Sequence, residues 1–228
     1  MGISTEDAKD TEGIKNTEGA KDQPPSVRSR ARQAVKTQVA EIGLELFLTD
    51  GFERTTTDQI AKAAGMSRAT FFRYFPTKED VVLTLVEDLA EQTRDALIHR
   101  PQDEPVWTAL RHALEPPVRE HAKNLDAALQ TARVIVESPS IRARLQERNR
   151  RWRELLLPEV ARRITPAVAS RPDPAASALI ASALSCLDAS IEAWVREEGR
   201  LPLPALLDEA MNAVHPLTTH AGPAEPST

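Results

Sequence analysis

The 228-residue chain contains one cysteine, Cys186, and only eight glycines. A single cysteine excludes an internal disulfide framework and suits a reducing compartment, so we expect a cytoplasmic protein. The glycines form no phosphate-binding loop, and the five histidines form no HExxH or HxxxH pair. We therefore expect neither a cofactor nor an enzyme, because catalysis would have to rely on residues brought together from distant parts of the chain.

Long apolar runs are missing as well. The longest uncharged stretch, residues 174–187, is shorter than the roughly 20 residues that a helix needs to cross a bilayer. The first ten residues, MGISTEDAKD, contain no basic segment followed by an apolar one, so we expect no signal peptide. The sequence therefore predicts no membrane partner.

The net charge of −5 is unevenly distributed along the chain. Residues 28–80 contain nine Lys and Arg against seven Asp and Glu, whereas the segments on either side are net negative. Surfaces that bind nucleic acid need positive charge, so this segment is the candidate for binding DNA.

Both ends of the chain are polar. Residues 1–27 lack aromatic side chains and nearly repeat one hexapeptide (DTEGIK, NTEGAK), and residues 217–228 contain glycine and proline. Such segments bury too little apolar area to fold. We expect two disordered tails, and we interpret the repeat as sequence drift rather than as a binding motif.

The stretch TTTDQIAKAAGMSRATFFRYFPTK, which begins at Thr55, predicts two short helices joined by a tight turn. Thr56 can cap the first helix, because a glutamine three residues later completes a capping box. Gly65 can end that helix, and Ser67 can cap a second helix over residues 68–74. A basic second helix after a glycine turn is typical of a helix-turn-helix.

Helical periodicity extends on both sides of this unit. The residues before it predict a helix over residues 29–50, whose start is crowded with Arg28, Arg30, Arg32 and Lys36. These form either a solvated arm or a basic arm that reaches DNA. After the unit, Thr77 can cap a helix that begins at Lys78 and continues to about His99. That helix would connect the DNA-binding unit to the rest of the chain.

Residues 101–228 show only helical signals. Prolines separate the periodic stretches, and no alternating strand pattern or Asn-Gly turn occurs. The expected helices cover residues 106–121, 125–138, 140–164, 173–198 and 204–214. The chain is therefore predicted to be all-α.

The helix-turn-helix and its flanks follow a known pattern. The matching residues are Leu46, Phe47, Gly51, Phe52, Thr55, Thr56, Ile60, Ala61, Ala64, Gly65, Met66, Ser67, Thr70, Phe71, Phe72, Arg73, Tyr74, Phe75, Pro76, Thr77, Lys78 and Glu79. Over roughly residues 30–82, this pattern closely resembles the signature of the tetracycline-repressor (TetR) family. The run FFRYFPTKED also resembles that of actinobacterial members related to the mycofactocin regulators.

This resemblance implies an all-α homodimer that binds a near-palindromic double-stranded DNA operator. Residues 28–77 would form a three-helix DNA-binding domain, and residues 78–216 an effector-binding and dimerisation domain. In the family, a small-molecule effector moves the connecting helix and separates the recognition helices, and most members are repressors. An alternative keeps the DNA-binding half but gives the second half a protein partner instead of a small ligand.

The matched positions also imply DNA contacts. Thr56 and Lys78 would contact phosphates, and Arg68 is the best candidate for a bidentate contact to guanine. The full set of expected contacts is Thr56, Thr57, Ser67, Arg68, Ala69, Thr70, Arg73, Tyr74 and Lys78.

One aromatic residue departs from the family pattern. Phe72 stands where the family typically has a tyrosine that hydrogen-bonds phosphate, and a phenylalanine cannot donate that bond. Either Arg73 or Tyr74 takes over, or the affinity for the DNA backbone is weaker. Phe71 and Phe75 are expected in the core, because they lie on the face opposite Arg68.

Large side chains in the second half are the candidates for a ligand cavity. They are Trp107, Leu110, Leu114, Val118, Leu129, Arg148, Trp152, Leu156 and Trp194. Buried tryptophan usually serves packing, so each aromatic residue is also a candidate for the core. Arg148, Arg151 and Trp152 would form a basic rim for an anionic ligand such as an acyl-CoA, or else belong to a solvated face.

Residues 174–187 are rich in Ala, Ser and Leu. Because small residues allow helices to approach closely, we expect this stretch to form the subunit interface together with residues 204–214. A charged substitution at Leu184 would then separate the subunits.

If Arg68 reads a base, Arg68→Ala will weaken binding to the operator by about 1–3 kcal/mol. Binding to random duplex DNA will change much less, because phosphate contacts carry it. Titrations of both duplexes at one salt concentration measure the difference, and an equal loss on both would contradict base reading.

Overall fold

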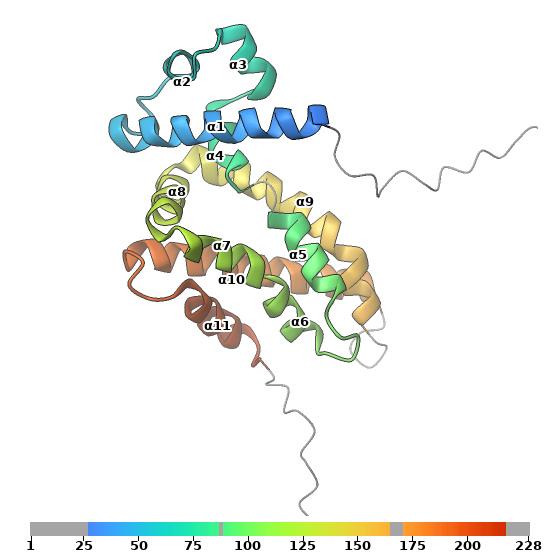
Figure 1. Cartoon of the computed structure of the whole chain (residues 1–228). Helices are drawn as coiled ribbons and strands as arrows, with labels where there is room; N and C mark the ends of the chain where they lie inside the picture. The colour runs from blue at the N-terminus through green and yellow to red at the C-terminus, as the bar shows by residue number, and fades with distance from the viewer. Residues whose placement is uncertain (1–26, 87–88, 165–170, 218–228) are drawn as a thin grey trace, which may run out of the picture.

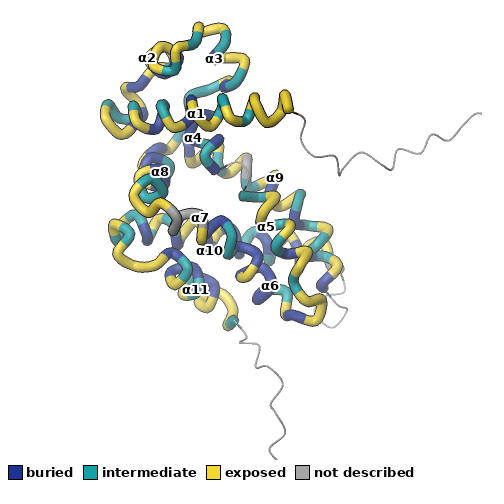
Figure 2. The backbone as a smooth tube through the Cα atoms, in the orientation of Figure 1, coloured by how far each residue is buried: buried dark blue, intermediate teal, exposed yellow. Residues whose placement is uncertain are grey.

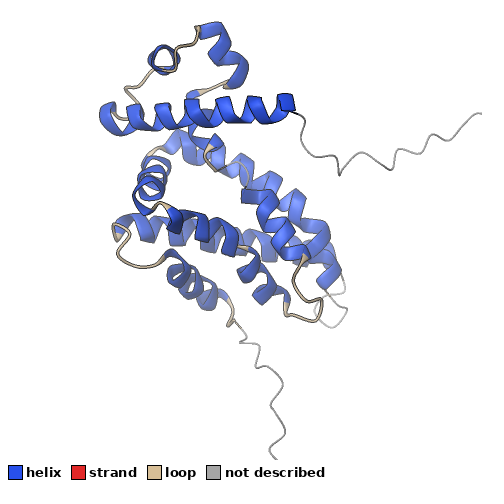
Figure 3. Ribbon diagram, viewed as in Figure 1, coloured by secondary structure: helices blue, strands red, loops and turns tan. Residues whose placement is uncertain are grey.

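The computed structural model describes residues 27–86, 89–164 and 171–217, without the side chains of residues 120–123, 148 and 172. Within these ranges the chain forms helices and no strand (Figures 1 and 3), so the predicted all-α class is confirmed. The predicted disordered tails lie outside the described residues, except for Val27 and Leu217. The helices are α1 (Val27–Asp50), α2 (Thr57–Ala63), α3 (Arg68–Tyr74), α4 (Lys78–Thr84), α5 (Leu89–Ile98), α6 (Val106–Ala113), α7 (Glu115–Lys123), α8 (Leu125–Glu137), α9 (Pro139–Arg163), α10 (Pro172–Arg196) and α11 (Leu203–Val214).

Local sequence signals define the ends of the short helices α2 to α4. The Thr56 hydroxyl accepts the backbone N–H of Gln59 at 3.2 Å, and the Gln59 side chain accepts the N–H of Thr56 at 2.8 Å. Thr77 and Asp80 form the same reciprocal capping box at the start of α4. Gly65 follows α2 with φ of +65°, which glycine adopts without strain. The predicted caps and the predicted glycine stop are therefore present.

Helices α1 to α4 enclose an aromatic core at one end of the molecule (Figure 1). Phe71 and Phe75 are fully buried, and their ring centroids lie 5.3 Å apart. The rings of Phe47 and Phe52 lie 4.8 Å apart in the same core. The expectation that Phe71 and Phe75 belong to the core is confirmed.

The connection between the two halves differs from the single helix that the sequence predicts over residues 78–99. Helix α4 ends at Thr84, and the backbone N–H groups of Leu85 and Val86 bond to carbonyls three residues back, both at 3.1 Å. The Thr84 hydroxyl donates to the Asp80 carbonyl at 2.9 Å, a bond that competes with regular helix geometry. A tight turn therefore separates α4 from α5.

Helices α5 to α11 form a second core, in which α10 packs against α6, α8, α9 and α11. Its largest fully buried side chains include Trp194, Leu110, Leu156 and Leu207. Over residues 173–196, α10 is long and apolar enough to cross a membrane by length and composition alone, and 44% of its apolar window is buried. The core helix of a soluble protein passes the same test, and part of this window of α10 packs in the second core.

The two halves share a packed junction at α4. Val81 and Val82 of α4 are fully buried, and Val134 of α8 and Ile141 of α9 belong to the same cluster as the aromatic core. Figure 2 shows buried positions where α1, α4 and α8 meet. A displacement of α8 or α9 therefore acts directly on the core that supports α3.

Two adjacent phenylalanines on α3 give a direct test of this core. Phe71→Ala is expected to lower the free energy of unfolding by about 3–5 kcal/mol, because it leaves a cavity at a fully buried site. Phe72→Ala is expected to cost less than about 1 kcal/mol, because that side chain is 40% exposed. Urea unfolding followed by circular dichroism measures both, and equal losses would contradict the assigned core.

Candidate DNA-binding surface and effector cavity

Helix α3 presents one polar face to solvent. The Ser67 hydroxyl caps the helix by accepting the N–H of Thr70 at 3.1 Å, and the two hydroxyls lie 2.9 Å apart. Arg68, Ala69 and Arg73 are exposed, whereas Thr70 is half-buried. Because the aromatic core holds the opposite face, these residues form the surface that could enter a DNA groove.

Arg68 is an exposed cation on this face, with 69% of its side chain accessible. Its Nη1 lies 3.3 Å from Oδ2 of Asp58, which comes from α2. Its guanidinium carbon lies 5.6 Å from the ring centroid of Phe72, one turn further along α3. Arg68 is therefore exposed but held by contacts on two sides.

Two of the predicted DNA contacts, Thr56 and Thr57, lie at the start of α2. Thr56 is exposed and Thr57 is half-buried. The Thr56 hydroxyl also lies 2.9 Å from the side-chain oxygen of Gln59. A phosphate contact by Thr56 remains a prediction, and that contact would have to share the hydroxyl with the helix cap.

Lys78 has an intramolecular role that its position in the motif does not reveal. Its ammonium group donates to the carbonyl oxygens of Phe52 at 2.8 Å and of Glu53 at 3.4 Å. It also lies 3.7 Å from the Glu53 carboxylate and 4.3 Å from the ring centroid of Phe52. Only 20% of the side chain is accessible. Lys78 therefore ties the segment between α1 and α2 to the start of α4, and its predicted phosphate contact would be a second role.

The basic residues at the start of α1 lie on a helix rather than on an extended arm. Arg32 donates to the carbonyl of Arg73 at 3.1 Å, and its guanidinium carbon lies 4.9 Å from the ring centroid of Tyr74. The guanidinium carbon of Arg73 lies 5.7 Å from the same centroid. The Tyr74 ring is thus packed by two cations, and Arg32 satisfies a carbonyl in the last turn of α3.

A cavity of about 460 Å³ opens in the second half. Its wall is apolar over most of α8 and polar where α9 faces α10. The lining residues are Val86, Leu89, Pro117, Val118, Thr131, Ala132, Ile135, Val136, Pro139, Arg142, Ala143, Leu145, Gln146, Asn149, Trp152, Leu184, Leu187, Asp188, Ile191 and Glu192. The size and the mixed lining suit a small organic ligand.

The structure places two of the ligand contacts expected from the sequence on this cavity and most of the others elsewhere. Val118 and Trp152 line the cavity. The expected contacts that belong to the packed core or lie against it, outside this lining, are Trp107, Leu110, Leu114, Leu129, Leu156 and Trp194. The Arg148 side chain lies outside the described part of the structure, and Arg151 is exposed and outside the lining. The cation on the wall is instead Arg142.

The polar wall consists of residues that the sequence analysis missed. Arg142, Gln146 and Asn149 lie on one face of α9, at the spacing of successive helical turns. Asp188 and Glu192 face them from α10, and the Asn149 amide donates to Asp188 at 3.3 Å. The helical spacing was visible in the sequence, but the pairing of the α9 and α10 faces was not.

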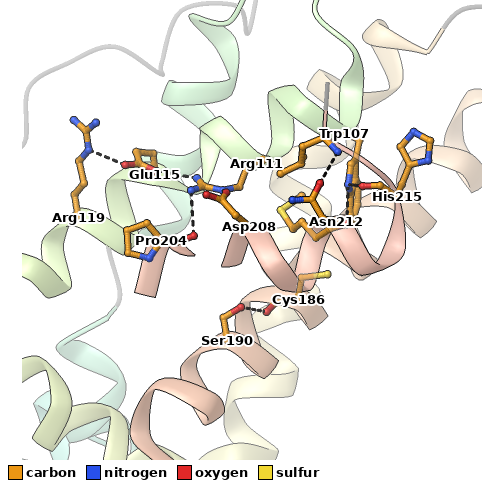
Figure 4. A network of polar contacts seen from close by, with 12 residues as sticks. Trp107, Arg111, Glu115, Arg119, Cys186, Ser190, Pro204, Asp208, Asn212 and His215 are labelled. Carbon is orange, nitrogen blue, oxygen red and sulfur yellow. Dashed lines mark hydrogen bonds and ion pairs between the residues drawn. The ribbon is translucent and has the colours of Figure 1, made fainter. Parts of the chain in front are cut away.

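Trp107 lies in a polar network between α6 and α11 (Figure 4). Its indole N–H donates to the carbonyls of His215 at 2.9 Å and Met211 at 3.3 Å. Nearby, Arg111 pairs with Asp208 and, at 2.8 Å, with Glu115. Burial alone would lower the pKa of Arg111, but the two carboxylates outweigh it and raise the pKa. This network fixes α11 to the bundle and explains why Trp107 does not line the cavity.

The cavity and the DNA-binding half share structural elements. Val86 follows α4, and Ile135 and Leu145 line the cavity while packing against the aromatic core. Arg144 on α9 donates to Oδ1 of Asp80 at 3.0 Å, and Oδ2 of the same carboxylate caps α4. The start of α4 is therefore tied to the helix that carries the polar wall.

The described residues include no candidate metal centre. No group of three metal-binding side chains occurs among them. Burial raises the pKa of the Cys186 thiol, so this cysteine favours its unreactive protonated form.

Family models match both halves of the chain. Residues 41–85 match the model described as bacterial regulatory proteins, tetR family. Residues 104–218 match the model of the MftR C-terminal domain. The first match covers the helix-turn-helix, and the second covers all helices from α6 to α11.

Individual relatives agree with these matches. The chain is 34% identical over 131 residues to the HTH-type transcriptional regulator TcmR of Streptomyces glaucescens. The matched region covers 55% of this chain and 58% of TcmR. The chain is 28% identical over 177 residues to a protein assigned as the mycofactocin biosynthesis transcriptional regulator MftR of Mycobacterium tuberculosis, over 74% of this chain and 84% of MftR. The structure of Thermus thermophilus FadR, a TetR-family repressor bound to lauroyl-CoA, is similar with a TM-score of 0.52 and 24% identity, over 84% of this chain and 100% of that chain.

Substitution of Lys78 tests its structural role separately from its predicted phosphate contact. Lys78→Met is expected to lower the free energy of unfolding by about 1–3 kcal/mol, because the Phe52 carbonyl loses its donor. If Lys78 also contacts phosphate, the same variant will bind every duplex more weakly, and the slope of log affinity against log salt will fall by about one. An unchanged slope with lowered stability would leave only the structural role.

Proposed function

Because the chain belongs to the TetR family of bacterial regulatory proteins, we propose that it is a ligand-responsive repressor. It binds a near-palindromic DNA operator as a homodimer in the cytoplasm, and a small molecule bound in the cavity releases it. The observation that carries this proposal is the shared wall between the cavity and the α4 junction. Ile135 and Leu145 line the cavity and pack against the aromatic core, and Val86 of the lining follows directly on α4, so a ligand that displaces these residues would act on the support of α3.

DNA binding follows from the exposed face of α3. Arg68 and Arg73 are exposed and Thr70 is half-buried, which supports base reading by Arg68 and Thr70 and a phosphate contact by Arg73. Two copies of α3 about 34–36 Å apart would read two half-sites one turn apart. Thr56, Thr57, Ser67, Ala69, Tyr74 and Lys78 complete the proposed contact set.

The dimer is proposed to form through α10 and α11. Ser185 and Ala189 are exposed small residues on α10, so a second copy of the helix can approach closely there. Leu184 is 5% exposed and lines the cavity, so it belongs to the interior of one subunit. A charge at Leu184 would disrupt the fold itself, and the interface is better probed at Ala189.

The charge of the cavity wall limits the class of effector. The described lining includes one cation, Arg142, and two carboxylates, Asp188 and Glu192, so the described part of the wall has no excess of positive charge. The T. thermophilus FadR structure contains lauroyl-CoA, but a polyanionic coenzyme A group would need more cations than this wall offers. We infer a neutral or weakly charged amphipathic effector.

The proposed function is tested in two steps. The full-length protein is first used to select duplexes from a random pool, and the expected result is a near-palindromic consensus. Small molecules are then screened for release of that duplex together with quenching of tryptophan fluorescence, because Trp152 lines the cavity. Failure to select any consensus would contradict sequence-specific regulation, and release only by a protein would support a protein partner instead.

The ion pair between Arg144 and Asp80 predicts a specific defect. Arg144→Gln is expected to keep operator affinity in the absence of effector, because Arg144 is not part of the α3 surface. It should reduce the loss of operator affinity that a saturating effector causes, because the link between α9 and α4 is weakened. Fluorescence anisotropy with and without an effector from the screen measures both values. Arg150→Gln, whose partner is Glu154 on the same helix, is the matched control and should respond like the wild type.

A further inference from the structure

Phe72 is an exposed aromatic residue on the proposed DNA-reading face, with 40% of its surface accessible. Its neighbours Phe71 and Phe75 are fully buried and account for the core. A phenylalanine here exposes apolar area and cannot donate a hydrogen bond.

Contacts on two sides hold the ring and the cation beside it. Phe72 stands edge-on to Phe71, with centroids 5.7 Å apart and an interplanar angle of 87°. The guanidinium carbon of Arg68 lies 5.6 Å from the centroid of Phe72. From α2, Asp58 accepts a hydrogen bond from Nη1 of Arg68 at 3.3 Å. Core packing thus fixes Phe72, and Phe72 and Asp58 together confine Arg68.

Confinement matters because a free arginine has a large side-chain entropy. Ordering such a side chain on binding costs conformational entropy. Asp58 occupies one nitrogen of the guanidinium and leaves the others available for two acceptors of a guanine edge. Arg68 is therefore partly ordered before it meets DNA.

We propose that Phe72 and Asp58 are positioning residues that orient Arg68 to read one guanine in each half-site. Phenylalanine at residue 72 cannot donate the hydrogen bond to phosphate that a tyrosine hydroxyl could donate. It still provides the aromatic ring against which Arg68 lies. This inference rests on the proposed function, because it requires sequence-specific DNA binding.

The test uses the full-length protein and the duplex that the wild type selects from a random pool. Affinity is measured at one salt concentration for that duplex and for duplexes substituted at each position of the half-site. Arg68→Ala identifies the base pair that Arg68 reads. Phe72→Leu and Asp58→Asn should each lower discrimination at that same base pair by about two- to fivefold.

Four further variants make the result specific. In the Arg68→Ala background, Phe72→Leu and Asp58→Asn should have no further effect on discrimination, since both act through Arg68. Phe72→Tyr keeps the ring and should keep discrimination at the wild-type level. Arg73→Ala, which removes an exposed cation from the same helix, should weaken all duplexes alike. Circular dichroism confirms that each variant is folded.

Several outcomes would overturn the inference. Loss of discrimination at a different base pair would mean that Phe72 contacts a base or a thymine methyl itself. Equal weakening of all duplexes, or an effect of Phe72→Leu that persists without Arg68, would exclude a positioning role. If the wild type selects no consensus, the proposed function fails first and the inference fails with it.

Discussion

The carboxylate of Asp80 makes a polar link between the start of α4 and α9. One oxygen caps α4 through Thr77, and the other accepts Arg144 from α9. Arg144 is 46% exposed and Asp80 is 24% exposed, so the pair stabilises the fold only slightly. Its importance is its position, because it connects the start of α4, directly after the recognition helix, to the helix that carries the polar wall of the cavity.

Apolar packing reinforces this link. Val81 and Val82 bury α4 in the aromatic core, and Ile141 of α9 belongs to the same cluster. The tight turn after Thr84 separates α4 from α5. A short helix that packs on both halves can shift as a unit, which a single helix continuing to residue 99 could not do without bending. This geometry gives the proposed effector response a physical route.

The parts of the molecule set by local sequence were predictable. Thr56, Ser67 and Thr77 cap their helices through residues three positions away, so spacing alone identifies them. The cavity was not predictable, because its lining depends on which faces of α8, α9 and α10 meet. Trp107 and Trp194 are used in packing, and no local pattern distinguishes them from Trp152 on the cavity wall. The pairing of Asp58 with Arg68 likewise joins two helices and has no local sequence signal.

The central claim is that the cavity and the DNA-binding surface are energetically coupled. Reciprocal titration tests it most directly: effector affinity is measured with and without saturating operator, and operator affinity with and without saturating effector. If the sites are coupled, each ligand will weaken the other by the same factor, as linkage requires. A compound that binds the cavity, as shown by loss of binding in a Trp152→Ala variant, and leaves operator affinity unchanged would contradict the account.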